Sequence, residues 1–157
     1  MLRRYVPVVR RRVGVVVLGL TMGLMSVASA QAQQKSPYAF AGDNAVFMNF
    51  IKADQTAAYE ELIGKLKEGL QKSDKPERKQ MAESWKVYKA TEAGPNGSVI
   101  YVSIISPVVK GTDYSIVSLL GEAFPNDARA LYDKYVAAFT TPPGQLFNLT
   151  LQTDMAK

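Results

Sequence analysis

Six side chains on the predicted strands carry hydrogen-bonding groups that a sheet would bring together: Asn49, Trp85, Tyr88, Tyr101, Ser103 and Asn148. Amide, hydroxyl and indole groups of this kind orient a small molecule inside an otherwise apolar pocket. None of these groups is an activated nucleophile or a general base at neutral pH. We therefore treat the six as candidate ligand-binding residues. The alternative is a hydrogen-bond network that satisfies buried polar atoms where two copies of the chain meet.

The residue types that the chain lacks restrict its chemistry further. It contains no His and no Cys. Catalysis by Ser-His-Asp or Cys-His groups, structural zinc and His-ligated haem are therefore excluded. The acidic residues Asp54, Asp74 and Asp113 stand at predicted helix starts, where they would cap backbone N–H groups. We predict no catalytic residue, no metal site and no cofactor.

The first 30 residues predict export. Five arginines precede an apolar run over 13–25, and Ala28-Ser29-Ala30 fits the small-x-small rule for signal cleavage. We predict a signal peptide over 1–30 and a periplasmic or secreted protein, which meets the membrane only while it is exported. An uncleaved membrane anchor is the alternative, although the apolar run is short for a membrane-spanning helix.

The positive charge of the chain belongs to this leader. The formal net charge is +5, and the leader holds five arginines and no acidic residue. The remainder has 14 Lys and Arg against 14 Asp and Glu, with the two signs mixed along the chain. A nucleic-acid partner is therefore not expected.

Beyond the leader, we divide the chain into a flexible lead-in over 31–44, one domain over 45–152 and a polar tail over 153–157. Hydrophobic periodicity predicts the secondary structure of the domain. The expected elements are a strand over 45–52, a helix from Asp54 to Lys72, a short helical turn over 76–83, two strands within 84–106 joined by a turn at 94–97, helical segments between 114 and 139, and a strand over 145–152.

This order of elements predicts an α+β fold. It is the ferredoxin-like βαββαβ arrangement, an antiparallel sheet with helices on one face, preceded by the signal peptide. If the hairpin loop has an even number of residues, the face without helices is also apolar. We expect that face to carry Phe47, Ile51, Tyr88, Tyr101, Ile105 and Leu146. A second copy of the chain is the simplest cover for such a face, so we predict a homodimer.

With this element order and these two-sided strands, the chain resembles the dimeric α/β-barrel superfamily. The segments AFAGDNAVFMNFIK and WKVYKATEAGPNGSVIYV are also similar to small exported bacterial proteins of unknown function. The superfamily resemblance implies two ferredoxin-like sheets packed face to face. Its cofactor-independent monooxygenases use an Asn, a Trp and a Tyr, and Asn49, Trp85 and Tyr88 are residues of those types.

Three functional hypotheses follow. The first is an exported homodimeric ferredoxin-like domain that binds a small ligand or a partner without catalysis. The second is a cofactor-independent monooxygenase or isomerase with a pocket built from Asn49, Trp85, Tyr88 and Tyr101. The third is a purely structural protein or an interaction protein associated with the cell envelope. A pocket of several hundred cubic ångströms lined by those four residues favours the second hypothesis, and a solid core favours the other two.

Overall fold

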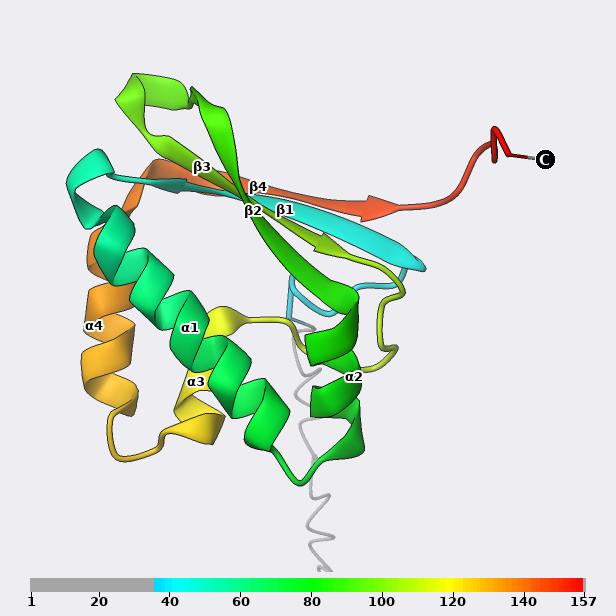
Figure 1. Cartoon of the computed structure of the whole chain (residues 1–157), viewed down its shortest axis with the longest axis horizontal. Coiled ribbons are helices and arrows are strands. Elements are labelled where there is room, and N and C mark those ends of the chain that lie inside the picture. The colour runs from blue at the N-terminus through cyan, green and yellow to red at the C-terminus, as the bar shows by residue number, and fades with distance from the viewer. Residues whose placement is uncertain (1–35, 157) are drawn as a thin grey trace, which may run out of the picture. The chain divides into compact units, whose positions relative to one another are not determined.

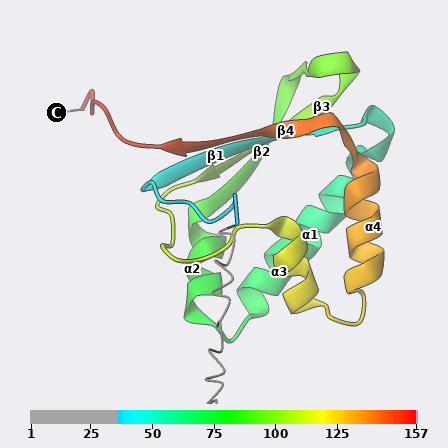
Figure 2. The ribbon, with the colours of Figure 1, turned by 180° about the vertical axis from the view of Figure 1, so that it is seen from behind.

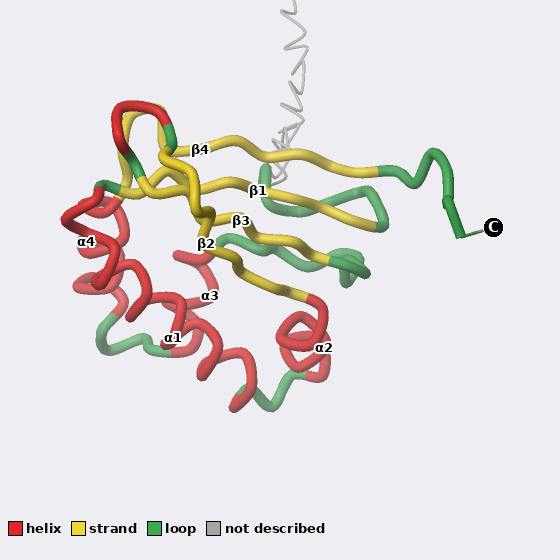
Figure 3. The backbone as a smooth tube through the Cα atoms, turned by 45° about the horizontal axis from the view of Figure 1, so that its top comes forward, coloured by secondary structure: helices red, strands yellow, loops and turns green. Residues whose placement is uncertain are grey.

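The computed structural model describes residues 36–156, and the predicted signal peptide lies outside the described residues. In this part, four antiparallel strands form one sheet in the order β2-β3-β1-β4, with the helices on one side of it (Figures 1 and 3). The elements in chain order are β1 (Asn44–Ile51), α1 (Thr56–Lys72), α2 (Pro76–Ser84), β2 (Trp85–Ala93), β3 (Val99–Ile105), α3 (Ile116–Ala123), α4 (Ala128–Ala138) and β4 (Phe139–Leu149). The α+β class is confirmed, and the arrangement is compatible with a ferredoxin-like fold. No helix within 36–156 has the length and apolar character to cross a membrane.

The helix α1 forms because one stripe of its surface is apolar. Tyr59, Leu62, Leu66 and Leu70 recur at intervals of three and four residues, and all four are buried against the sheet and the neighbouring helices. Lysines and glutamates occupy much of the remaining surface. The helix thereby closes one face of the sheet while its polar side stays in water.

The predicted helix caps are wrong. A short 3₁₀ turn over Ala53–Gln55 precedes α1, and Asp54 makes no side-chain cap. The helix α3 is capped by Ser115, whose hydroxyl accepts a hydrogen bond from the Ser118 N–H. Asp113 instead accepts hydrogen bonds from the Ser115 N–H and from the hydroxyl of Ser36. The Asp113 carboxylate therefore holds a loop rather than a helix end, because a short polar side chain can also accept from nearby loop N–H groups.

One face of the sheet, which we call the helix face, carries the odd-numbered residues of β1 (Ala45, Phe47, Asn49 and Ile51), and all four are buried. The hairpin pairs Trp85 with Ile105 and Lys89 with Tyr101, so Tyr101, Ser103 and Ile105 lie on this same face. Our prediction put Phe47, Ile51, Tyr101, Ile105 and Leu146 on the face without helices, and that prediction is wrong. Ala93 pairs with Val99, so the hairpin loop spans 94–98 and has an odd number of residues. The prediction assumed an even number, so the side chains of β3 project from the faces opposite to those expected.

The opposite side of the sheet, which we call the open face, has no helix over it (Figures 1 and 2). Strand pairing aligns its side chains in rows across β2, β3, β1 and β4. They are largely apolar, and several are well exposed, including Tyr88, Ile104, Phe147 and Leu149. The expectation of a sheet that is apolar on two sides is therefore met, with a different set of residues on the uncovered side.

The lead-in is packed rather than loose where it is described. Phe40 is 3% exposed, and its ring centroid lies 5.5 Å from that of Tyr114 and 6.3 Å from that of Phe47. The Tyr114 N–H donates a hydrogen bond to the carbonyl of Tyr38 at 3.0 Å. These contacts hold residues 36–43 to the domain and place the Tyr38 side chain beside the sheet.

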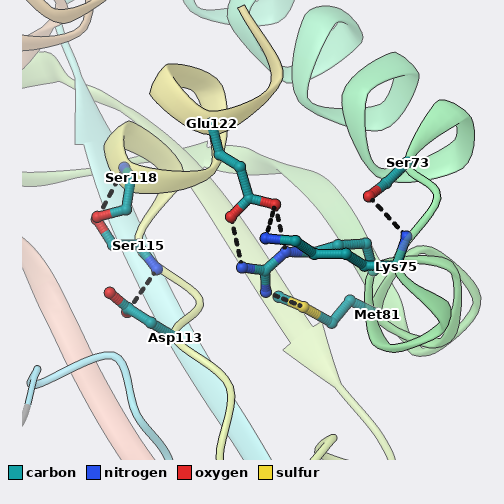
Figure 4. Close-up of polar contacts among 8 residues, drawn as sticks. Ser73, Lys75, Met81, Asp113, Ser115, Ser118 and Glu122 are labelled. Carbon is teal, nitrogen blue, oxygen red and sulfur yellow. Dashed lines mark hydrogen bonds and ion pairs between the residues drawn. The ribbon is translucent and has the colours of Figure 1, made fainter. Parts of the chain in front are cut away.

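Helices α2 and α3 are joined by a cluster of charges (Figure 4). The Glu122 carboxylate on α3 accepts hydrogen bonds from Nε and Nη2 of Arg78 on α2, at 3.2 and 2.8 Å, and from Nζ of Lys75 at 3.0 Å. The Arg78 side chain is only 14% exposed, so this fork-to-carboxylate pair is shielded on one side. The hydrogen bonds from Arg78 are the largest cause that lowers the pKa of Glu122 to about 2.

This cluster predicts a loss of stability in acid. A carboxyl whose folded pKa of about 2 lies below its ordinary value of 4.5 stabilises the fold above pH 4.5, and the contribution is lost as the pH falls toward 2. Because Glu122 is 36% exposed, solvent screening reduces the contribution to about 1–2 kcal/mol. We expect Glu122→Gln to lower the free energy of unfolding by that amount at pH 7 and by about a quarter of it at pH 2.5, measured by urea denaturation.

The matched control is Glu83→Gln, at an exposed position on α2. Its unfolding free energy is expected to follow that of the wild type at both pH values. Equal losses for Glu122→Gln at pH 7 and pH 2.5 would contradict the role given to the Arg78–Glu122 pair.

Candidate functional site

A cavity of about 470 Å³ lies between β1, β4 and α4. Its lining includes Asn49 and Phe47 from β1, Tyr135 and Val136 from α4, and Tyr38 from the lead-in. The β4 segment from Phe139 to Leu146 supplies much of the remaining wall. The volume lies within the range of about 300–1,000 Å³ that is typical of pockets for small molecules.

The cavity follows from an irregular pairing of β4 with β1. Asn49 pairs with Gly144, and Ile51 pairs with Phe139, so residues 140–143 stand opposite the single residue Phe50. The Thr140 hydroxyl lies 3.2 Å from the carbonyl oxygen of Phe50 and can donate to it. Pro142 and Pro143 need no N–H partner at this edge of the sheet. The four residues therefore bulge away from β1 and leave space between the strands and α4.

Gly144 brings the strands together again beside the cavity. A Cβ atom added at Gly144 would lie 1.9 Å from the carbonyl oxygen of Met48, and the backbone φ of Gly144 is 155°. No residue with a side chain fits this approach without moving the backbone of β1. Gly144 thus determines where the bulge ends and where regular pairing resumes.

The polar groups of the cavity are neutral. Asn49 is 6% exposed, and its Nδ2 donates a hydrogen bond to the hydroxyl of Tyr59 at 2.7 Å. Burial raises the pKa of Tyr59 far above its ordinary value, and burial likewise raises the pKa of Tyr135. Both phenols stay protonated at physiological pH. The side chains that line the cavity include no Asp, Glu, Lys or Arg. The cavity can therefore offer hydrogen bonds but no charge.

Tyr101 belongs to a second network next to this one. Its ring lies 4.7 Å from that of Tyr59, and its hydroxyl donates to Oε1 of Glu60 at 2.5 Å. Lys89 donates to the same oxygen at 3.0 Å. The hydrogen bonds from Tyr101 and Lys89 lower the pKa of Glu60, which lies at the solvent-exposed end of the network. We interpret this network as a structural link between α1 and the β2–β3 hairpin.

The six predicted site residues do not surround one space. Asn49 lines the cavity, while Tyr88 lies on the open face and is 50% exposed. Trp85 packs against Phe47 and Tyr114 in the core, and its indole N–H and the Ser103 hydroxyl are buried with no hydrogen-bond partner among the described residues. Asn148, at the end of β4, accepts hydrogen bonds from the N–H groups of residues 41 and 42.

Sequence reasoning missed most residues of the cavity, among them Tyr38, Tyr135 and Gly144. Tyr38 falls in the predicted flexible lead-in, and Tyr135 falls in the predicted helical segments between 114 and 139. Residues 140–144 were expected to form a loop, and the Pro-Pro-Gly sequence there was the available signal for a bulge beside a strand.

Comparison with known proteins adds nothing to this geometry: no family model, curated protein or solved structure matches the chain. Within residues 36–156, no group of three or more Asp or Glu side chains is placed to hold a metal ion. The neutral cavity is therefore the candidate functional site.

The close approach at Gly144 gives a direct test of the bulge. We expect Gly144→Ala to lower the free energy of unfolding by about 2–4 kcal/mol, because the new methyl group would overlap the Met48 carbonyl. Gly64→Ala is the control, since Gly64 lies in α1 with no atom within 4 Å of the added Cβ, and the change is expected to stabilise the protein by up to about 1 kcal/mol. Urea denaturation measures both, and a Gly144→Ala protein as stable as the wild type would show that the strands do not meet in this way.

Proposed function

We propose that this domain is a binding module whose cavity takes a small, uncharged and largely apolar molecule. The observation that carries the proposal is the cavity of about 470 Å³ beside the β4 bulge. Its walls are mostly apolar and aromatic, and the polar residues among them are Tyr38, Asn49, Tyr135, Thr140, Thr141 and Gln145. An apolar wall with a few fixed polar groups favours a neutral ligand that has one or two hydrogen-bonding atoms.

Binding is better supported than catalysis. The alternative of a cofactor-independent monooxygenase or isomerase requires Asn49, Trp85, Tyr88 and Tyr101 around one pocket, and of these four Asn49 lines the cavity. Tyr88 lies on the opposite side of the sheet from the other three. The phenols beside Asn49 have raised pKa values, which makes them poor proton acceptors at neutral pH.

Filling the cavity tests the proposal. Val136 lines the cavity from α4 and is half exposed, so a larger side chain can be placed there without disturbing the core. We expect Val136→Trp to weaken binding of the neutral probe 1-naphthol at least tenfold, measured by isothermal titration calorimetry. The control is Tyr132→Trp, one turn earlier on the same helix, at an exposed position outside the cavity.

Equal binding of 1-naphthol by the two variants would contradict the cavity as the ligand site, and a wild-type protein that binds no probe would favour a structural role. The naphthoate anion is expected to bind at least tenfold more weakly than 1-naphthol, because the cavity offers no positive charge to pair with a buried carboxylate.

We also propose that the domain is ferredoxin-like, exported and homodimeric. The β1-α1-β2 unit supports the fold, because β1 and β2 run parallel with β3 between them, as in a split βαβ unit. The basic and apolar leader supports export. The open face supports the homodimer, because Val46, Met48 and Val102 form an apolar centre that Tyr88, Ile104 and Phe147 extend. A contiguous apolar surface on an uncovered sheet face favours an interaction site.

The homodimer predicts the effect of a charge at the centre of the open face. Val102 pairs with both Met48 and Tyr88 and is only partly buried in one copy of the domain. We expect Val102→Asp to give a folded monomer, because the carboxylate would be buried without a partner in the dimer. Light scattering after size-exclusion chromatography gives the mass, and Gln80→Asp on the exposed side of α2 is the control that should remain dimeric. A dimeric Val102→Asp protein would rule out the open face as the interface.

A further inference from the structure

Asn49 is the most deeply buried polar side chain in the wall of the cavity. It is 6% exposed, whereas the other polar residues of the lining are partly buried or exposed. A hydrogen bond to a deeply buried group contributes more than one to an exposed group, because water competes for it less. Asn49 is therefore the residue of the lining with the greatest capacity to discriminate between ligands.

The contact with Tyr59 fixes the orientation of the Asn49 amide. Nδ2 of Asn49 donates a hydrogen bond to the Tyr59 hydroxyl at 2.7 Å. Tyr59 is fully buried and does not line the cavity, so Nδ2 points into the core. The nitrogen and the oxygen lie on opposite sides of the planar amide, and the oxygen is its acceptor. Because Asn49 lines the cavity, Oδ1 lies on the cavity side.

This Oδ1 atom is free to accept hydrogen bonds. Three buried side-chain atoms within residues 36–156 have no hydrogen-bond partner: Trp85 Nε1, Ser98 Oγ and Ser103 Oγ. Oδ1 of Asn49 is not one of them, although no described residue donates to it. The atom is therefore accessible rather than sealed in the core, and the space beside Asn49 is the cavity of about 470 Å³. Oδ1 offers its lone pairs to the molecule that fills this space.

The rest of the wall cannot replace this acceptor. The Thr140 hydroxyl lies 3.2 Å from the carbonyl oxygen of Phe50 and 3.0 Å from that of Pro142, and its single proton is used there. The lining includes no Asp or Glu side chain, so a ligand that brings a proton donor has no carboxylate to pair with. A donor that enters the cavity beside β1 therefore meets the Asn49 oxygen.

A ligand either satisfies Oδ1 or leaves it unpaired. Water can donate to this oxygen in the absence of a ligand. A ligand that displaces the water and brings only acceptors loses the hydrogen bond, whereas an O–H or neutral N–H group replaces it. An ammonium group would donate as well, but its charge would be buried without a counter-charge.

We propose that Asn49 selects neutral ligands that carry a hydrogen-bond donor, an O–H or N–H group, which donates to its Oδ1 atom. This inference rests on the proposed function and narrows its ligand class to alcohols, phenols and neutral N–H compounds, as opposed to ethers, esters and ketones. Tyr59 is a positioning residue, because it holds Nδ2 of Asn49 without lining the cavity.

The test compares two probes with the same ring system. 1-Naphthol carries a hydroxyl donor, and 1-methoxynaphthalene carries an ether oxygen that can only accept. Isothermal titration calorimetry gives both dissociation constants, and their ratio cancels the changes in the cavity that affect the two probes equally. We expect Asn49→Leu to reduce the preference for 1-naphthol by about tenfold or more relative to the wild type, because the variant lacks Oδ1.

Two further variants make the result specific. Asn126→Leu makes the same chemical change at an exposed position outside the cavity, and its preference is expected to equal that of the wild type. Asn49→Leu leaves the Tyr59 hydroxyl buried without its donor, so Asn49→Leu with Tyr59→Phe is measured as well. Replacing both partners with apolar groups costs little stability, and the loss of preference is expected to be the same. Circular dichroism checks that each variant is folded.

The outcomes separate this inference from the proposed function. An unchanged preference in the folded Asn49 variants, with Val136→Trp still blocking 1-naphthol, would overturn the role of Asn49 and leave the cavity as the ligand site. A preference for 1-naphthol that rises in these variants would show that the amide presents an N–H group to the ligand, which also overturns the inference. A wild-type protein that binds neither probe would overturn the proposed function and the role of Asn49 together.

Discussion

The structure depends on the burial of β1. This strand is apolar on both sides, and the helices of the described residues cover the helix face and leave the open face uncovered. Ala45, Phe47, Asn49 and Ile51 are buried beneath α1, α3 and the lead-in, and the hydrophobic contacts of this row hold the layers together. Val46 and Met48 are apolar as well, yet within one copy they receive only partial cover. The helix face therefore accounts for stability, and the open face stays partly exposed in a single copy.

Asn49 is the polar exception in the buried row, and its surroundings show how the fold accommodates it. A buried amide without partners would destabilise the protein, so it donates to the Tyr59 hydroxyl, which α1 carries to that point. The Tyr59 ring packs against Tyr101 and Phe139, which connects β3 and the start of β4 to the same centre. Asn49 also lines the cavity, next to the point where β4 bulges away from β1. One residue thus belongs to both the core and the candidate site.

The sequence predicted the elements well and their mutual alignment poorly. Hydrophobic periodicity located β1, α1 and the hairpin, because these segments have strong local patterns. The hairpin faces were wrong because they depend on the parity of a loop, and the 3₁₀ turn at Pro95–Gly97 gives a loop of five residues rather than an even number. The strand β4 begins at Phe139 instead of 145, since an edge strand tolerates Pro142 and Pro143 that would disrupt a central one.

The same limits explain why, of the six predicted site residues, Asn49 lines the cavity and the other five do not. A local pattern can indicate that Asn49 or Tyr101 lies in a strand, but the cavity arises from a bulge between two strands that are distant in the sequence. Tyr38 and Tyr135 reach the cavity from a lead-in and a helix that have no regular relation to the strands. The position of such a site depends on how segments that are distant in the sequence pack together. No short motif in a single sequence predicts that packing.

The cavity and the open face are joined through β1 and β4. Met48 and Gln145 pair with each other across these strands, and both line the cavity while belonging to the rows of the open face. A second copy on the open face would therefore contact β1 and β4, the two strands that also form the cavity wall. A ligand that filled the cavity would in turn hold the bulge in one conformation, and binding energies that act on one shared element are coupled in both directions. The irregular pairing of β4 is thus a feature through which the proposed ligand binding and the proposed assembly would influence each other.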